Sequence, residues 1–255
     1  GSFNWYGIAM CFALFFNENL RQELGIEDLY ALVDNGEWTI DKLTELSRFA
    51  SKDLDSNGRW TIKDRYGLGV FNPICGDVMA LASGFEHVTN NGDGTFTINI
   101  GNEKHMAILE KVYDLYKKDN HIAMTNADCK MFSEGRALFF NDYIFDSVNF
   151  REMTDDFGIL PMPKYNEAQE HYISYADSWS LANALPICTK PEDYEMIGAV
   201  INSLSVESLN KVYPAYYEYT LKGRDTRDTD SWRMLDIISS SLVYDFGIFF
   251  IQGGS

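Results

Sequence analysis

Two short apolar runs closed by a pair of prolines constrain the fold of this chain more than any other feature. Residues 136–140 (RALFF) and 157–160 (FGIL) predict short buried strands. The second run stops at residues 161–163 (PMP), where the prolines lack the backbone donors that a strand ladder needs. Residues 132–135 (FSEG) predict the end of a helix, because glycine readily takes the left-handed conformation found there. The segment therefore predicts a helix followed by two strands of one sheet.

Polar and aromatic residues follow the first of these strands. Asn141, Asp142, Tyr143 and Phe145 come directly after residues 136–140. Open α/β sheets bind their ligands just outside the carboxyl ends of the strands. We therefore expect a binding site at this edge of the sheet.

The composition is that of a globular, acidic protein. A chain of 255 residues with 45% hydrophobic and 15% aromatic residues can bury a sizeable core, as one large domain or two small ones. The formal net charge of −17 argues against nucleic acid and anionic membrane surfaces as partners, because phosphate groups are bound by clustered Lys and Arg. The sequence contains no run of 18 apolar residues and no signal peptide.

Four cysteines stand in separate segments of the chain. Cys11, Cys75, Cys129 and Cys188 form no CxxC pair, which argues against a zinc knuckle. Cys11 and Cys188 lie in apolar runs, so we expect buried free thiols there, with a single disulfide as the alternative.

The two ends of the chain look like residues added during cloning. The sequence opens with Gly-Ser and closes with Gly-Gly-Ser, and the apolar run 10–16 begins very near the start. We expect an excised part of a longer protein, without that protein's targeting segment.

Expected strands alternate with expected helices, which predicts the α/β class with a mixed sheet flanked by helices. The expected strands cover residues 5–16, 67–71, 136–140, 157–160 and 172–184, together with a hairpin of 88–89 and 95–98 around the turn at 90–94. The expected helices cover residues 18–24, 73–83, 102–118, 191–204, 206–212 and 231–241, and a further helix begins after residue 38.

Two of these helices carry informative patterns. The helix after residue 38 has Thr39 as its N-cap and apolar positions at Ile40, Leu43, Leu46 and Phe49. The helix at 102–118 is amphipathic, with apolar residues at positions 106, 109, 112, 113 and 116.

The order of these pieces resembles the extracellular solute-binding protein family 1, the sugar-capturing subunits of ABC importers. The motifs that carry the resemblance are F-x-x-G-x-A at 132–137, G-x-x-P-x-P at 158–163, FNENL at 16–20, GEWTIDKL at 36–43, YPAYY at 213–217, RD at 227–228 and MLDI at 234–237.

This resemblance implies a lobe of the type II periplasmic-binding-protein kind, with one large departure. The first sheet of the family, which forms the N-terminal lobe, has no counterpart in the sequence. Residues 3–212 would be the C-terminal, second lobe. Residues 213–252 would form the hinge crossover and helices that pack on the missing N-terminal lobe.

The resemblance also implies a function. The chain would be the ligand-closing lobe of the substrate-binding component of an ABC importer, capturing an extracellular carbohydrate. Its partners would be a small molecule such as an oligosaccharide, the ABC permease and the missing N-terminal lobe. The parent would be an extracellular lipoprotein on the cell surface of a bacterium, with its signal and anchor absent here. It would need no catalytic residues and no cofactor.

Aromatic and short polar residues at strand ends are the candidates for ligand binding. Rings stack on the C–H faces of sugars, while carboxylates and amides bond to the hydroxyl groups. The candidates are Trp5, Tyr6, Asn72, Asp142, Tyr143, Asp177 and Trp179. Each could instead be a core or surface residue. Tyr216 and Tyr217 could also reach a cleft, although packing between helices is the simpler interpretation.

Residues 53–64 (DLDSNGRWTIKD) fit a calcium loop. Oxygen ligands fall at loop positions 1, 3 and 5, a glycine makes the turn at position 6, and an aspartate stands at position 12. The ligands would be Asp53, Asp55, Asn57, the Arg59 carbonyl, Thr61 and Asp64, holding a structural Ca²⁺. Asp64 replaces the usual bidentate glutamate, and a solvated surface turn is the alternative.

Catalytic patterns are weak in this sequence. His87, His105, His121 and His171 stand alone, and no nucleophile elbow is present. A carbohydrate-active enzyme, a glycoside hydrolase or lyase with an acidic cleft, remains the alternative function because acidic residues are abundant. A surface interaction domain that has lost transport is a third interpretation.

Overall fold

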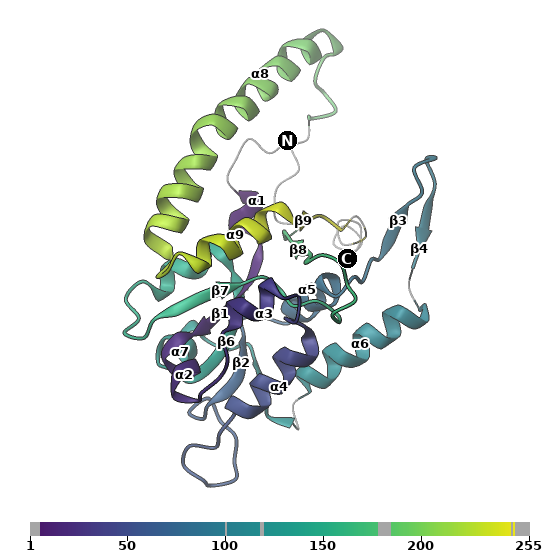
Figure 1. Ribbon diagram of the computed structural model, residues 1–255. Coiled ribbons are helices and arrows are strands. Elements are labelled where there is room, and N and C mark those ends of the chain that lie inside the picture. The colour runs from purple at the N-terminus through teal and green to yellow at the C-terminus, as the bar shows by residue number, and fades with distance from the viewer. Residues whose placement is uncertain (1–5, 100, 118–119, 178–184, 246, 248–255) are drawn as a thin grey trace.

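The computed structural model describes residues 6–99, 101–117, 120–177, 185–245 and 247 (Figure 1). A five-stranded mixed sheet forms its centre, in the order β5-β2-β6-β1-β7. The strands are β1 (Phe12–Asn17), β2 (Tyr66–Val70), β5 (Ala123–Thr125), β6 (Ala137–Tyr143) and β7 (Phe157–Leu160). The expected α/β class and mixed sheet are confirmed.

The strand directions bring the expected site residues to one edge of this sheet. β2 runs parallel to β5 and β6, whereas β1 is antiparallel to β6 and β7. The carboxyl ends of four strands therefore meet the amino end of β1. In the register Val70 lies opposite Asn141, and Phe12 lies opposite Tyr143.

Helices cover both faces of the sheet, because side chains along β1 alternate between two cores. Phe12, Leu14 and Phe16 belong to one core, and Ala13 and Phe15 belong to the other. The first core is covered by α2 (Glu18–Glu23), α3 (Leu29–Asp34), α4 (Ile40–Ala50), α5 (Ile74–Ala82) and α6 (Glu103–Tyr116). The second is covered by α1 (Tyr6–Ala9), α7 (Cys129–Ser133) and the 3-10 helix η2 (Ile144–Phe150).

Local signals in the sequence explain several element boundaries. Thr39 is the N-cap of α4, and its hydroxyl accepts a bond from the Lys42 backbone N–H. The helix expected at 73–83 forms as α5, with Pro73 as its N-cap residue. Gly25 and Gly135 follow α2 and α7 with φ of 67° and 72°, the left-handed conformation that ends a helix without a Cβ penalty.

The long strand expected at residues 5–16 is wrong. Tyr6–Ala9 forms the short helix α1, and only Phe12–Asn17 forms a strand. A continuous apolar run has no period that separates a buried helix from a buried strand, which explains the error. The strand expected at 172–184 is reduced to β8 (Ser174–Tyr175), and residues 178–184 lie outside the described part of the chain.

The hairpin of β3 (Val88–Asn90) and β4 (Phe96–Ile98) is confirmed. Helix α6 also forms as expected, but much of its anticipated apolar stripe faces outward. Met106, Leu109 and Tyr113 are exposed. Val112 is buried, and the other buried positions are His105, Ile108 and Leu115.

The cysteine expectation is half right. Cys11 and Cys75 are buried free thiols, whereas Cys188 is exposed, so its expected burial is wrong. The reason is that Cys188 lies in a turn and belongs to neither buried core. None of the four cysteines forms a disulfide.

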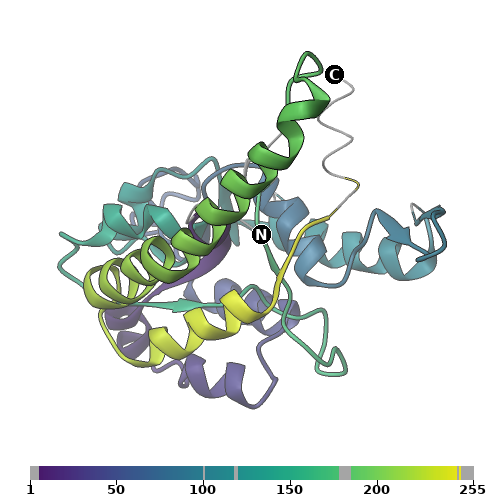
Figure 2. The ribbon, with the colours of Figure 1, turned by 90° about the horizontal axis from the view of Figure 1, so that it is seen from above.

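The last third of the chain is helical. The 3-10 helix η3 (Pro191–Asp193) leads into α8 (Tyr194–Glu207) and the π-helical segments η4 (Ser208–Val212) and η5 (Ala215–Asp225), followed by α9 (Asp230–Ser240) and β9 (Leu242–Val243), which pairs with β8. The sequence did not predict η5. Figures 1 and 2 show α8 standing out from the body of the molecule.

Segments η5 and α9 pack on the sheet described here. Leu221 and Leu235 are buried in the second core, and Met234 is buried in the first. Tyr217 is buried and its hydroxyl donates to Asp236 Oδ1 at 2.7 Å, which agrees with the packing interpretation of this tyrosine. The division of the chain at residue 212 stays a prediction.

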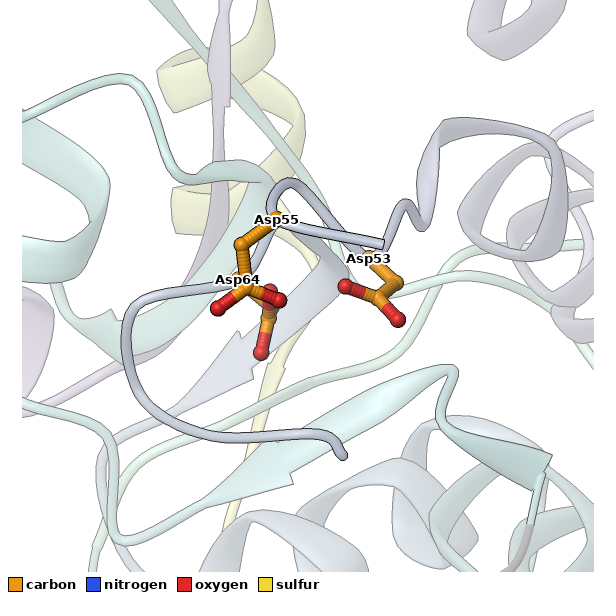
Figure 3. Close-up of side chains that lie close together, drawn as sticks. All are labelled: Asp53, Asp55 and Asp64. Atoms are coloured by element: carbon orange, nitrogen blue, oxygen red, sulfur yellow. The ribbon is translucent and has the colours of Figure 1, made fainter. Parts of the chain in front are cut away.

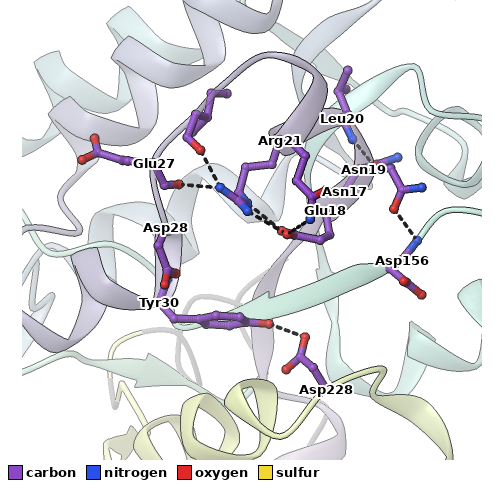
Figure 4. Close-up of polar contacts among 12 residues, drawn as sticks. Asn17, Glu18, Asn19, Leu20, Arg21, Glu27, Asp28, Tyr30, Asp156 and Asp228 are labelled. Atoms are coloured by element: carbon purple, nitrogen blue, oxygen red, sulfur yellow. Dashed lines mark hydrogen bonds and ion pairs between the residues drawn. The ribbon is translucent and has the colours of Figure 1, made fainter.

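A polar network ties the helices beside β7 together (Figure 4). Arg21 Nε donates to Glu18 Oε2 at 2.6 Å, and Arg21 also donates to the carbonyl of Glu27 at 3.2 Å. Tyr30 donates to Asp228 Oδ2 at 2.7 Å, joining α3 to the start of α9. The side chains of this network are hydrogen bonded to one another and to the backbone, so we regard the network as structural. Among the described residues, no helix has the length and apolar composition needed to cross a membrane.

Candidate ligand site at the carboxyl edge of the sheet

Tyr143, the last residue of β6, is the centre of an aromatic group at the sheet edge. Its ring centroid lies 4.2 Å from that of Phe12, 5.5 Å from that of Phe145 and 6.2 Å from that of Phe71. The Phe145 ring is nearly parallel to Tyr143, with 19° between the planes. Phe71 is 42% exposed and Phe145 is 37% exposed, so two of these rings are open to a ligand. We call Phe71, Tyr143 and Phe145 the aromatic platform.

Asp177 holds Tyr143 in place. The Tyr143 hydroxyl donates to Asp177 Oδ2 at 2.5 Å, and the Asp177 backbone N–H donates to the carbonyl of Met10. Asp177 is buried, so it orients the ring rather than facing solvent. Burial, with the Asp177 hydrogen bond as the next cause, raises the pKa of Tyr143 far above its usual value. Tyr143 is therefore a neutral hydroxyl at any physiological pH.

Asp142 in β6 and Asp146 in η2 form a carboxyl pair in the segments that carry Tyr143 and Phe145. Burial and then the charge of Asp146 raise the pKa of Asp142 to about 8. Burial also raises the pKa of Asp146. Asp142 Oδ1 also accepts a hydrogen bond from the Tyr143 backbone N–H at 2.8 Å. At neutral pH both causes, burial and the Asp146 charge, favour the protonated form of Asp142.

Asn72 lies next to Phe71, just after β2. Its Oδ1 accepts a bond from the Ile74 backbone N–H at 2.8 Å, so its carbonyl group serves the start of α5. Asn72 is half-buried beside the platform. Four sequence-predicted residues, Asn72, Asp142, Tyr143 and Asp177, thus lie in one region.

Three other candidates cannot be placed in this way. Trp5 and Trp179 lie outside the described residues. Tyr6 begins α1, but its side chain also lies outside the described part of the structure.

Sequence reasoning did not select Phe71 or Asp146. Phe71 is the residue directly after β2, and Asp146 stands four residues after Asp142. Strand-end position and this spacing were the available signals. Phe71 contributes an exposed ring to the platform, and the charge of Asp146 raises the pKa of Asp142.

A separate hollow of about 640 Å³ lies beside α4, but its lining does not suit a sugar. It contains the acidic residues Glu27, Glu37, Asp41, Glu45 and Glu167 and no aromatic ring. The platform is therefore the better candidate for ligand binding.

The expected calcium loop brings three carboxylates together (Figure 3). Ligand oxygens of Asp53, Asp55 and Asp64 all lie within 4.8 Å of one another. Asp53 Oδ1 is buried and has no hydrogen-bond partner among the described residues. Bonds from the Thr61 backbone N–H, and secondarily from that of Leu54, lower the pKa of Asp64, so its carboxylate stays charged despite its burial.

The other predicted loop ligands border this cluster. Asn57 Nδ2 donates to Asp55 Oδ2 at 2.6 Å, and Asn57 Oδ1 accepts from the Arg59 backbone N–H at 2.6 Å. The Thr61 hydroxyl donates to Asp64 Oδ2 at 3.2 Å. Carboxylate and carbonyl oxygens suit Ca²⁺, and a cation would offset the repulsion of three like charges.

Comparison with known proteins gives the fold. No family model matches the chain, and no curated protein matches it. UspC from M. tuberculosis matches with a TM-score of 0.60 and 13% identity, over 92% of this chain and 63% of UspC. The ABC substrate-binding protein Lmo0181 from Listeria monocytogenes, solved with cycloalternan, matches with a TM-score of 0.58 and 11% identity, over 92% of this chain and 58% of Lmo0181.

A third structure agrees with these two. The maltose/maltodextrin-binding domain MalE from Bdellovibrio bacteriovorus, bound to maltotriose, matches with a TM-score of 0.53 and 15% identity, over 91% of this chain and 55% of MalE. The chain has the fold of a solute-binding protein. It spans less than two thirds of the length of each of these three structures, which is consistent with a lobe of that fold.

Proposed function

We propose that this chain is the ligand-closing lobe of an extracellular substrate-binding component of an ABC importer, and that its ligand is a carbohydrate. The observation that carries the proposal is the aromatic platform, in which exposed Phe71 and Phe145 both lie in ring contact with Tyr143 at the sheet edge. Flat rings with nearby polar groups match the C–H faces and hydroxyl edges of a sugar. Maltotriose and cycloalternan, the ligands named for two structures of the same fold, are carbohydrates.

The proposed mechanism is closure of two lobes on one ligand. A ligand that touches both lobes binds the closed state better and so shifts the population toward it. This chain would supply the platform, and a second lobe would supply the rest of the site. The ABC permease, a lipoprotein anchor and an extracellular location belong to this proposal.

The alternative enzymatic function gains no support from the Asp142–Asp146 pair. Glycoside hydrolases separate their two carboxyl groups by about 5 to 9.5 Å so that a sugar or water fits between them. Asp142 is only 2% exposed and its Oδ1 accepts from the Tyr143 backbone N–H, so this carboxyl group does not face a sugar. We therefore assign Asp142 to positioning Tyr143.

Calorimetry of the 255-residue chain with maltotriose and related oligosaccharides tests the proposal. Half a site should bind weakly, with Kd in the millimolar range or about −4 kcal/mol. Phe71→Ala should abolish the heat of binding, and Tyr113→Ala, at an exposed tyrosine on α6, should not. Micromolar binding by the chain alone would contradict the split site. If Phe71→Ala has no effect on binding, the platform is not the sugar site. If the complete gene product binds no carbohydrate, the proposed carbohydrate-binding function is contradicted.

We also propose that residues 53–64 hold a structural Ca²⁺. Three converging carboxylates and the unpartnered, buried Asp53 Oδ1 support this proposal. The ion would close the loop between α4 and β2 and so reduce its conformational freedom. It would take no part in ligand binding.

A further inference from the structure

The rings of the aromatic platform do not all lie in one plane. The plane of Phe71 is inclined by 64° to that of Tyr143, whereas Phe145 is nearly parallel to Tyr143, at 19°. Phe71 and Phe145 are the exposed rings, and Tyr143 is in ring contact with both. A sugar ring stacks on one flat face, whereas two inclined rings can share a compact group between them. The platform therefore offers a place for such a group beside its stacking surface.

A protonated amine is the compact group that inclined aromatic rings bind. The face of an aromatic ring is electron-rich and attracts a cation that lies within about 6 Å of the ring centroid. Sets of such rings form the aromatic cages that recognise ammonium groups. The centroids of Phe71 and Tyr143 are 6.2 Å apart, so one cation can lie within this range of both rings.

The charges around the platform have the sign that an ammonium group needs. Asp142 directly precedes Tyr143, and Asp146 directly follows Phe145. The carboxyl group of Asp177 accepts the Tyr143 hydroxyl. Burial is the largest cause of the raised pKa of Tyr143, and the charges of Asp177 and Asp142 raise it further. These effects indicate a negative potential at the platform.

Lys and Arg are missing from the stretches of sequence that form this edge of the sheet. Residues 66–84, 137–150 and 172–177 supply β2, β6 and β8 together with the residues that follow each strand. None of these three stretches contains Lys or Arg. The net charge of −17 adds to a potential that repels phosphate, sulfate and carboxylate groups and attracts cations.

We propose that the ligand is a carbohydrate with a protonated amino group, an amino sugar, and that this group lies between Phe71 and Tyr143. This inference rests on the carbohydrate function proposed above and narrows it from sugars in general to cationic ones. The sugar ring stacks on Phe145, and the negative potential of the edge stabilises the ammonium charge. The same potential disfavours anionic sugars such as uronic acids and sugar phosphates.

Calorimetry with a matched pair of ligands tests the charge preference. The glucosamine trimer and the N-acetylglucosamine trimer have the same length and linkage, but only the first carries ammonium groups at about pH 6. The 255-residue chain should bind the glucosamine trimer at least about fivefold more tightly, which is the contribution of one exposed cation–π contact. Added NaCl should reduce this preference, because salt screens the negative potential.

Two conservative variants locate the preference. Phe71→Leu keeps an apolar side chain but removes the ring, and Asp146→Asn keeps the shape of the side chain but removes its charge. Each should reduce the ratio of the two affinities to less than about twofold. Both variants should fold, because Phe71 is 42% exposed and Asp146 is only half-buried. Glu170→Gln, at an exposed carboxylate, is the control and should keep the full ratio.

The possible results separate this inference from the function on which it rests. Equal or tighter binding of the N-acetylated trimer overturns the amino-sugar inference and leaves the carbohydrate function standing. A ratio that survives both Phe71→Leu and Asp146→Asn also overturns it, because the ammonium group would then lie elsewhere. If the 255-residue chain gives no heat with either trimer, the complete gene product is compared in the same way. Binding of maltotriose but not of the glucosamine trimer then overturns this inference alone, and binding of no carbohydrate overturns the proposed function as well.

Discussion

The Tyr143 hydroxyl donates a 2.5 Å hydrogen bond to Oδ2 of Asp177 and joins the end of β6 to the segment after β8. Asp177 is buried, whereas the Tyr143 ring reaches the edge where Phe71 and Phe145 are exposed. One bond thus connects the interior of the sheet to the surface proposed for the ligand. A preoriented ring loses little freedom when a sugar stacks on it, which favours binding.

Removing this hydroxyl should destabilise the protein while leaving the platform in place. Tyr143→Phe keeps the ring and deletes the donor to a buried carboxylate, and we expect a loss of about 1.5 to 3 kcal/mol in the free energy of unfolding. Urea denaturation followed by fluorescence measures it. Tyr113→Phe, at a tyrosine that is 68% exposed, should change stability by less than about 0.5 kcal/mol. Equal effects of the two substitutions would show that the Asp177 bond contributes nothing.

The Asp142–Asp146 pair predicts a dependence of stability on pH. The pKa of Asp142 is about 8 in the folded chain and about 4 when unfolded, so the folded state binds more protons between these values. Stability should therefore fall as pH rises from 4 to 8, by at most about 1.4 kcal/mol per pH unit, and level off above pH 8. Asp142→Asn mimics the protonated form and should remove most of this slope and raise the Tm at pH 8.

Thermal unfolding between pH 5 and 9 measures this effect. Glu170→Gln, at an exposed carboxylate whose side chain is 87% accessible, is the control and should leave the slope unchanged. A slope in Asp142→Asn as steep as in the parent chain would place the responsible proton elsewhere.

Much of the fold was predictable because local signals agree with tertiary packing. The run at 157–160, the N-cap at Thr39 and the glycines after α2 and α7 each fix an element through backbone chemistry alone. The helix at Tyr6–Ala9 before β1 was not predictable, since an apolar run fits a helix and a strand equally well. The outward-facing residues of α6 were also missed, because hydrophobicity does not report which side of a helix meets the core.

The candidate site was predictable in part. Strand-end position selected Asn72, Asp142 and Tyr143 correctly as neighbours, because parallel strands end at the same edge. Sequence could not show that Asp142 is buried or that Asp146 folds back on it. Burial and charge pairing depend on the 3-10 turn after β6, which carries no distinctive sequence signal.

Calcium should stabilise the chain through the loop at 53–64. An ion that binds only the folded state adds about 2.7 kcal/mol at a concentration one hundred times its Kd, which raises the Tm by several degrees. Asp55→Asn should abolish this calcium-dependent increase, because it removes a charge from the cluster. Differential scanning calorimetry with Ca²⁺ and with EDTA measures it. Asp93→Asn, in the Asp- and Gly-containing turn of the β3–β4 hairpin, is the matched control and should retain the full increase. An increase that survives Asp55→Asn would exclude this loop as the site.

Gly67 in β2 permits the close approach of α4 to the sheet. A Cβ added there would lie 1.9 Å from the backbone carbonyl oxygen of Ser47, a contact that no side-chain rotation can relieve. Gly67→Ala should therefore push α4 away from β2 and cost at least about 2 kcal/mol, as overpacking of a core does. Gly198→Ala on α8 meets nothing within 4 Å and should instead stabilise that helix by about 0.5 to 1 kcal/mol. If α4 and β2 touch as described, urea denaturation should give a lower free energy of unfolding for Gly67→Ala and a higher one for Gly198→Ala. An unchanged free energy of unfolding in Gly67→Ala would mean that α4 lies farther from β2 and that the first core is packed less closely than described.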